Sequence, residues 1–391
     1  MRGRRLESLS MFIDTNWGSL PKHGEELCGD NVEIVKSGDS VVAVIADGLG
    51  SGVKANILSK MTAKIIATMF EKGGRLDEIV DTVSHTLPVC QKRHIAYSTF
   101  TILEVKADGE VYVVEFDNPA VFYLHNGEIG AINYRESEIC GKLIKESRFH
   151  VNLGDFLVAI SDGVVHAGIG AILNLGWQWG DIAEYLQKIA KPRSDATSVC
   201  QDLLDACNQL YAGQPGDDAT VLTIGIRKPK TLTVAVGPPQ NRADDRLLVN
   251  LLREETGQKV ICGGTTGTII ARALGREIEV DLKEFIDPEV PPTGSLQGID
   301  LVTEGIITLS KALEYLKGAR YLKDLPDPKN GAAALSRVFW ENDRIRFLVG
   351  RAINPAHQNP SLPVLGLKTQ VVNEIMDILK GVGKEVSVQY L

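Results

Sequence analysis

Apolar residues in the first half of the chain form either short runs or helically spaced patterns. Residues 41–46 are a mostly apolar run, which is typical of a buried strand. Residues 54–70 carry apolar side chains three and four positions apart, which predicts a helix with one buried face. Further strands are predicted at 97–106, 111–116, 120–124, 149–151, 155–160 and 221–226, and helices at 76–86, 177–190 and 194–211. Tight Asp-Gly and Asn-Gly turns between strands, with helices interspersed, predict an antiparallel α+β architecture.

The pattern changes after a short charged segment with a proline at residues 227–230. Beyond it, strands alternate with helices, which predicts a second, α/β domain. Strands are expected at 231–236, 260–262, 277–282, 299–302, 344–349 and 385–390, and helices at 244–255, 266–274, 306–316, 332–340 and 369–379. Because a chain of 391 residues suggests two domains, we place them at residues 1–229 and 230–391.

Composition and charge narrow the class of protein. A hydrophobic content of 44% is enough for sizeable cores, and a net charge of -8 argues against nucleic acid as the main partner. We expect no membrane span, because no run of about eighteen apolar residues is present. The basic start lacks the apolar region of a signal peptide, and the cysteines form no CxxC pair. A cytoplasmic protein with reduced thiols is therefore expected.

Acidic residues lie at the ends of several predicted strands in the first domain. Asp47 and Asp162 each end an apolar run and precede a glycine, Asp30 lies in CGDN, and Asp217 and Asp218 precede a strand. A plain turn explains each one alone. Gathered in one place, however, these carboxylates would repel one another unless protons or a cation neutralised them. Oxygen ligands of this kind suit Mg²⁺ and Mn²⁺, so the sequence predicts a divalent metal site.

In chain order, the motifs CGDN, IADGLGSG, AISDGV and GDDAT resemble those of the metal-dependent (PPM-type) serine/threonine protein phosphatases. The DGxGxG turn is most similar to the sporulation stage II E-like (SpoIIE) branch, and the resemblance covers residues from about 10 to 227. It implies an α-β-β-α sandwich of two antiparallel sheets flanked by helices, here followed by a smaller α/β domain. It also implies two Mn²⁺ or Mg²⁺ ions and hydrolysis of phosphoserine or phosphothreonine on a protein substrate by a metal-bound water.

The same resemblance assigns roles to individual residues. Asp47 would bridge both ions and Gly48 would offer its carbonyl oxygen, while Asp162 and Asp217 would be further ligands. Asp30 would hold the metal-bound water. Asp218 is the alternative to Asp217, but the family pattern of Asp, then Asn or Asp, then any residue, then Thr favours Asp217.

One position departs from the eukaryotic branch, which has a histidine where this chain has Leu49. The proton donor to the leaving group is therefore unassigned. His166 is a candidate because it lies near Asp162 in sequence, although a surface histidine is the simpler interpretation. The turn at residues 118–120 also resembles one in the family, and it would either line the site or serve as a structural turn.

The second domain carries a glycine-threonine turn between a predicted strand and helix, formed by Gly263, Gly264, Thr265, Thr266 and Gly267. Glycines let the backbone approach an anion, and a helix N-terminus favours negative charge. A phosphate or nucleotide site that adjusts the phosphatase is therefore one hypothesis. Helix capping alone would also explain the threonines. The turn is neither a P-loop nor a dinucleotide fingerprint, and we recognise no family for this domain.

Two functions remain open at this point. The first is a protein phosphatase of bacterial signalling with a regulatory or ligand-binding C-terminal domain. The alternative is a non-catalytic sensor or partner-binding protein on the same scaffold. The clustered carboxylates favour the enzyme, because a binding module does not need them.

Overall fold

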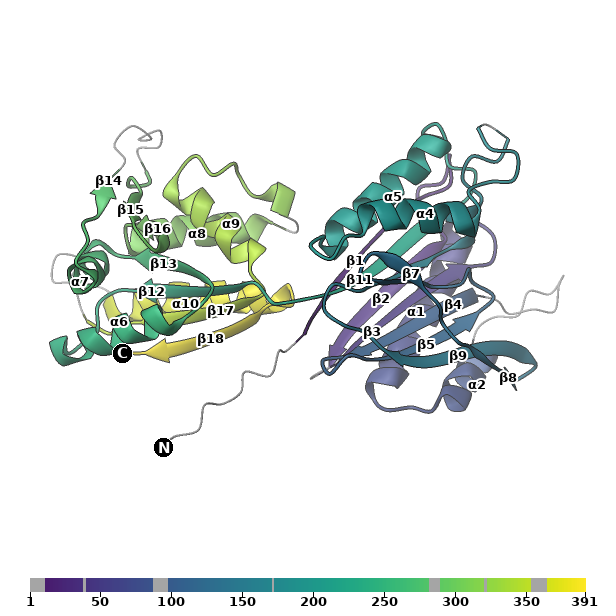
Figure 1. Cartoon of the computed structure of the whole chain (residues 1–391), viewed down its shortest axis with the longest axis horizontal. Coiled ribbons are helices and arrows are strands. Elements are labelled where there is room, and N and C mark those ends of the chain that lie inside the picture. The colour runs from purple at the N-terminus through teal and green to yellow at the C-terminus, as the bar shows by residue number, and fades with distance from the viewer. Residues whose placement is uncertain are drawn as a thin grey trace. The chain divides into compact units, whose positions relative to one another are not determined.

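The computed structural model describes residues 11–37, 40–86, 98–170, 172–280, 289–319, 322–352 and 364–391. The chain divides into two compact units, Met1–Lys228 and Pro229–Leu391 (Figure 1). Each unit has hydrophobic clusters of its own. Parts of two expected strands, residue 97 and residues 281–282, lie outside the described residues.

The first unit contains two antiparallel sheets. The five-stranded sheet has the order β1-β11-β10-β6-β7, and the six-stranded sheet has the order β2-β3-β4-β5-β9-β8. The strands of the first are β1 (Phe12–Leu20), β11 (Ala219–Arg227), β10 (Phe156–Ile160), β6 (Phe122–His125) and β7 (Glu128–Gly130). Those of the second are β2 (Asp30–Ser37), β3 (Ser40–Gly48), β4 (Ser98–Lys106), β5 (Glu110–Phe116), β9 (Lys142–His150) and β8 (Arg135–Ile139).

Helices cover the outer face of each sheet, which gives the unit four layers (Figure 1). They are α1 (Gly52–Glu71) and α2 (Leu76–Thr86) on the six-stranded sheet, and α4 (Trp179–Ile189) and α5 (Ala196–Leu210) on the other. The apolar run in β3 follows from this layering. Val42 and Val44 pack against the helices, whereas Ala43 and Ile45 pack between the sheets. The expected α-β-β-α sandwich is confirmed.

The six-stranded sheet extends further at its β9-β8 edge than the sequence pattern predicted. In this sheet β8 was not predicted, and only the end of β9 was; in the five-stranded sheet the edge strand β7 was not predicted either. The side chains of β8 are mostly exposed or half-buried, so an edge strand of this kind needs no apolar run. Its turn to β9 uses Cys140 and Gly141, both with positive φ, rather than the Asn-Gly or Asp-Gly pair that signals a hairpin.

The second unit contains a seven-stranded sheet in the order β14-β15-β16-β13-β12-β17-β18. Its strands are β12 (Thr231–Val236), β13 (Gln258–Cys262), β14 (Glu279–Val280), β15 (Gly294–Leu296), β16 (Ile299–Thr303), β17 (Arg344–Val349) and β18 (Glu385–Tyr390). The five strands from β16 to β18 in this order pair in parallel, so their C-terminal ends meet at one edge.

Helices lie on both faces of that sheet, as an α/β domain requires. They are α6 (Asp245–Glu254), α7 (Gly264–Leu274), α8 (Ile306–Gly318), α9 (Gly331–Glu341) and α10 (Val364–Gly381). Along β12, Val234 and Val236 pack in the cluster that includes α8, α9 and α10. Ala235 packs in the cluster that includes α6 and α7. None of the described helices is long and apolar enough to cross a membrane.

Candidate metal centre

Two aspartates meet where β2 begins and β3 ends. Asp30 and Asp47 are antiparallel register partners, so their side chains lie on the same face of the sheet. Asp30 is only 3% exposed, and neither of its carboxylate oxygens has a hydrogen-bond partner. Burial raises the pKa of Asp30 to about 7. Burial, followed by the charge of Asp30, raises the pKa of Asp47 to about 9. Two carboxyl groups, one buried and one half-buried, are therefore held side by side.

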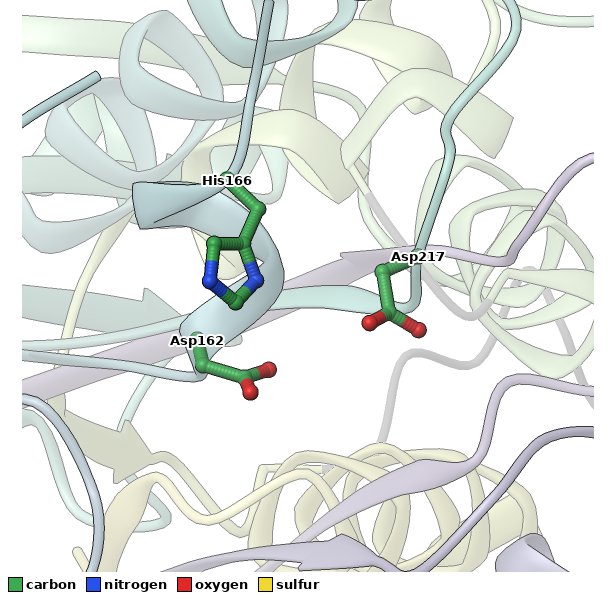
Figure 2. A group of neighbouring side chains, drawn as sticks. All are labelled: Asp162, His166 and Asp217. Carbon is green, nitrogen blue, oxygen red and sulfur yellow. The ribbon is translucent and has the colours of Figure 1, made fainter. Parts of the chain in front are cut away.

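A second acidic group forms at the ends of the neighbouring strands in the other sheet. Asp162 lies two residues after the end of β10 and opens the short helix α3 (Asp162–Val165), while Asp217 lies two residues before the start of β11. His166 follows α3, and its backbone N–H donates to the carbonyl of Asp162 at 2.9 Å. One ligand atom from each of these three side chains lies within 4.8 Å of the others. Figure 2 shows all three side chains directed into the same region.

The two groups interact electrostatically. The charges of Asp162 and Asp217 both contribute to the raised pKa of Asp47, after burial and the charge of Asp30. Burial also raises the pKa of Asp162 itself. Asp47 at the edge of the six-stranded sheet is therefore within electrostatic range of Asp162 and Asp217 at the edge of the five-stranded sheet.

The structure separates the environments of Asp217 and Asp218. Asp217 is half-buried beside Asp162 and His166. Asp218 is buried, and its Oδ1 accepts a hydrogen bond of 3.0 Å from the backbone N–H of Lys22. Its Oδ2 has no hydrogen-bond partner. Asp217 therefore lies in the group with Asp162 and His166, whereas Asp218 has a contact that holds the Lys22 loop.

Glycines in two of the motifs are required by packing. A Cβ on Gly48 would lie 2.1 Å from the carbonyl oxygen of Ala55 in α1, and one on Gly163 would lie 2.0 Å from the carbonyl oxygen of Asp218. The Asp-Gly turns therefore press directly against neighbouring backbone. Because packing explains Gly48, the glycine itself does not assign its carbonyl oxygen as a ligand.

The residues present fit a hard divalent cation. The donors are carboxylate oxygens, with one imidazole within reach, and such a set suits Mg²⁺ or Mn²⁺. Among the described residues of the first unit, three buried carboxylate oxygens, two on Asp30 and one on Asp218, have no hydrogen-bond partner. Buried polar atoms are normally satisfied, so these oxygens are explained if a ligand or ion completes the site.

The turn at residues 118–120 lies beside Asp47. Thr99 is the register partner of Asp47 on β4, and its hydroxyl donates to Asn118 Oδ1 at 2.5 Å. Asn118 Nδ2 in turn donates to the hydroxyl of Thr101 at 3.2 Å. This turn therefore braces the strand next to Asp47, and a structural role accounts for its contacts.

Two residues near the site carried no signal in the sequence. Glu25 accepts a hydrogen bond of 3.0 Å from Ser51 in the glycine-rich turn after Asp47, but it lies in a loop without a pattern. Tyr211 follows α5, and its hydroxyl donates to the carbonyl of Gly163 at 2.6 Å, which fixes the turn after Asp162. Both contacts join residues far apart in sequence, so no local motif could have indicated them.

The glycine-threonine turn of the second unit lies at the start of α7. Gly263 precedes the helix with φ +130°, a conformation that favours glycine. Gly264 and Thr265 are exposed, whereas Thr266 and Gly267 are buried. The turn is therefore at a strand-to-helix junction, as the sequence indicated.

Comparison with known proteins gives a family for the first unit. Residues 37–227 match the family model described as Stage II sporulation protein E (SpoIIE). No curated protein matches the chain.

Solved structures give only distant similarities. The PP2C phosphatase domain of SpoIIE from Bacillus subtilis, with a fragment of its regulatory domain, has 19% identity and a TM-score of 0.47. That match covers 56% of this chain and 64% of that chain, which is under two thirds of its length. The RsbU and RsbW domains of a Mycobacterium tuberculosis protein have 17% identity and a TM-score of 0.48, with 63% and 69% covered. RsbX in complex with magnesium has 17% identity and a TM-score of 0.39, with 55% and 95% covered.

These structural similarities are too weak to carry an argument, so the assignment relies on the family model and the ordered motifs. Residues 37–227 of this chain form a PP2C-like domain of the SpoIIE family.

Proposed function

We propose that the first unit is a metal-dependent phosphatase that hydrolyses phosphoserine or phosphothreonine on a protein substrate, in bacterial signalling. The proposal rests on the pair of buried Asp30 and half-buried Asp47 beside the group of Asp162 and Asp217. Carboxylates in such a place repel one another, and a cation removes both the repulsion and the cost of burial.

Two divalent ions would be held by side chains from both sheets. The charges of Asp30, Asp162 and Asp217 all raise the pKa of Asp47. A position close to all three suits a carboxylate that bridges two ions. Asp162 and Asp217 would be ligands, with Gly48 as a candidate through its carbonyl oxygen. When bound, Mg²⁺ or Mn²⁺ supplies activation of water at neutral pH and neutralises charge on the phosphoryl oxygens.

The chain's own residues would orient the water and the substrate. The carboxylate of Asp30 has two buried oxygens without hydrogen-bond partners, so it would accept hydrogen bonds from a water beside Asp47. A covalent nucleophile is not needed for this reaction.

His166 is proposed as a third donor beside Asp162 and Asp217, because its ring nitrogen lies within reach of both carboxylates. It would bind or position a cation there. The alternative, an exposed histidine without a role, is tested by substitution, as described in the Discussion.

The proposal is tested by hydrolysis of p-nitrophenyl phosphate and of phosphoserine and phosphothreonine peptides, with Mn²⁺, Mg²⁺ or EDTA. These substrates should be hydrolysed with Mn²⁺ or Mg²⁺ and not hydrolysed with EDTA. Metal binding by calorimetry without any hydrolysis would instead support the non-catalytic sensor.

A further inference from the structure

Five strands of the sheet in the second unit are parallel, and their order along the sheet reverses at β12, the first of them in the chain. Along the sheet the parallel strands run β16-β13-β12-β17-β18, so chain order proceeds outward from β12 in both directions. In sheets of this type, ligands bind outside the C-terminal ends of the strands, where the order reverses. A ligand site in this unit is therefore expected at the C-terminal ends of these strands.

Glycines follow three neighbouring strands at that edge. Gly237 follows β12, Gly263 follows β13 and Gly350 follows β17. The backbone N–H of Gly237 donates to the carbonyl oxygen of Cys262, and that of Gly350 donates to the carbonyl oxygen of Val236. These hydrogen bonds hold the ends of the three strands next to one another. A Cβ built on Gly263 would lie 3.8 Å from the nitrogen of Gly237. Three residues without side chains are thus gathered where the strands end, of which Gly237 and Gly263 are half-buried and Gly350 is buried.

The start of α7 opens onto these glycines. Gly263 at the N-cap has no side chain to cap the helix, and a Cβ on the exposed Gly264 would meet nothing within 4 Å. The neighbouring helix α8 differs, because Glu304 accepts a hydrogen bond of 3.3 Å from the N–H of Ile307 in its first turn. The first N–H groups of α7 therefore have no side-chain cap at Gly263 and could bind an external anion.

A buried hydroxyl without a partner lies at this helix start. Thr266 is 0% exposed, and its Oγ1 has no hydrogen-bond partner. The same oxygen lies 3.2 Å from the position of a Cβ on Gly263, so it is directed toward the N-cap. Leaving a buried hydroxyl unsatisfied is unfavourable, and a ligand oxygen at the cap would satisfy it.

A lysine completes the arrangement. Lys368 of α10 donates to the carbonyl oxygens of Gly350 and Ala352, and its Nζ would lie 2.6 Å from a Cβ on Gly237. Burial lowers the pKa of Lys368. None of the ion pairs found among the described residues includes Lys368, so carbonyl oxygens are its partners there. An ammonium group in this position would gain from a nearby anion.

We propose that the C-terminal edge of this sheet binds a phosphate-bearing small molecule. Its phosphate would lie at the start of α7, against Gly237 and Gly263, and would contact the Thr266 hydroxyl and the Lys368 ammonium group. This proposal does not depend on the phosphatase activity of the first unit.

The test uses the full chain in EDTA, so that phosphate has no metal to bind in the first unit. Inorganic phosphate, AMP and ATP are titrated by calorimetry, and their effect on the melting temperature is measured. We expect at least one of the three to bind. Binding of phosphate alone would show that this group is sufficient, whereas binding of only AMP or ATP would add a nucleoside subsite.

Three variants locate the site. Thr266→Val and Lys368→Met each remove a polar contact and should weaken binding about tenfold or more. Gly264→Val adds a side chain in the open space at the helix start and should block the ligand. The matched control is Gly318→Val at the end of α8, where a Cβ also meets nothing within 4 Å. This control should bind as the wild type does.

Thr266→Val also separates binding from folding. Because the hydroxyl has no partner, the variant should melt at the wild-type temperature or above in the absence of ligand. A folded Thr266→Val protein that binds as tightly as the wild type would overturn the proposal. So would the failure of all three compounds to bind the wild-type chain.

Discussion

Asp30 and Asp47 are register partners across the first two strands of the six-stranded sheet, at the end where β2 begins and β3 finishes. An antiparallel register places two acidic side chains opposite each other on one face, an arrangement that is unfavourable for like charges. Here burial adds to the effect, since Asp30 is almost inaccessible. Without metal, the protein therefore retains protons at this pair well above the ordinary carboxyl pKa.

The first prediction concerns pH. The folded-state pKa values of about 7 for Asp30 and about 9 for Asp47 exceed the ordinary carboxyl value of about 4. Folding then favours the protonated carboxyls, so the metal-free protein should lose stability as pH rises from about 4 toward 9. Metal displaces those protons, and its affinity should rise over the same range.

Melting temperatures from pH 5 to 9, in EDTA and in saturating Mg²⁺, measure this effect. The stabilisation by Mg²⁺ should grow with pH. A Mg²⁺-induced shift that stays constant from pH 5 to 9 would show that the ion displaces no protons from Asp30 and Asp47.

The second prediction separates two adjacent residues. Asp217→Asn should weaken metal binding far more than Asp218→Asn, because Asp217 lies with Asp162 and His166 whereas Asp218 holds the Lys22 backbone. Calorimetry with Mn²⁺ measures both. Equal losses, or a larger loss for Asp218→Asn, would move the ligand role to Asp218.

The third prediction concerns His166. If its ring is a donor to the cation beside Asp162 and Asp217, His166→Gln should lower Mn²⁺ affinity about tenfold or more, within the range seen when groups around a metal are removed. The control is His85→Gln, which changes an exposed histidine on α2. An unchanged Mn²⁺ affinity in His166→Gln would return this residue to a surface role.

Parts of the fold follow directly from local sequence. The apolar run of β3 has both faces buried, and the helical spacing of α1 matches the face that packs on β2 and β3. The hairpin of β8 and β9 could not be found in this way. The side chains of β8 are exposed or half-buried, and the Cys140–Gly141 turn is not a common hairpin signal.

The site shows the same limit. Each Asp-Gly turn was visible, but the opposition of Asp30 and Asp47 depends on strand register, which the motifs do not encode. Lys368 is a stronger example. It lies on the last helix of the second unit, and only the folded sheet brings it beside Gly237. Local patterns therefore indicated the acidic turns, whereas tertiary structure was needed to show how they meet and to find Lys368.

The fourth prediction concerns regulation by the second unit. We propose that a ligand at the start of α7 alters phosphatase turnover, with a coupling of about 5- to 150-fold, the usual range for allosteric effects. AMP is the probe, since inorganic phosphate is the reaction product. Turnover of a phosphothreonine peptide is measured with and without AMP, at fixed free Mn²⁺.

The matched proteins are Gly264→Val, which should not respond to AMP, and Gly318→Val, which should respond as the wild type does. If AMP binds the second unit but leaves turnover unchanged in the wild type, the unit is a binding module without control over the phosphatase.

Asp47→Asn is the sharpest test of whether the aspartates at the sheet edges hold metal ions for phosphoprotein hydrolysis. Turnover of phosphoserine and phosphothreonine peptides with Mn²⁺ is compared among the wild type, Asp47→Asn and the control Asp202→Asn, which changes an exposed aspartate on α5. Turnover of Asp47→Asn should fall about a hundredfold or more, since metal stabilisation is worth several kcal/mol. Turnover of Asp202→Asn should be unchanged, and in EDTA the melting temperature of Asp47→Asn should be no lower than that of the wild type. Near-normal Mn²⁺-dependent turnover in a folded Asp47→Asn protein would show that Asp47 does not hold a catalytic metal ion.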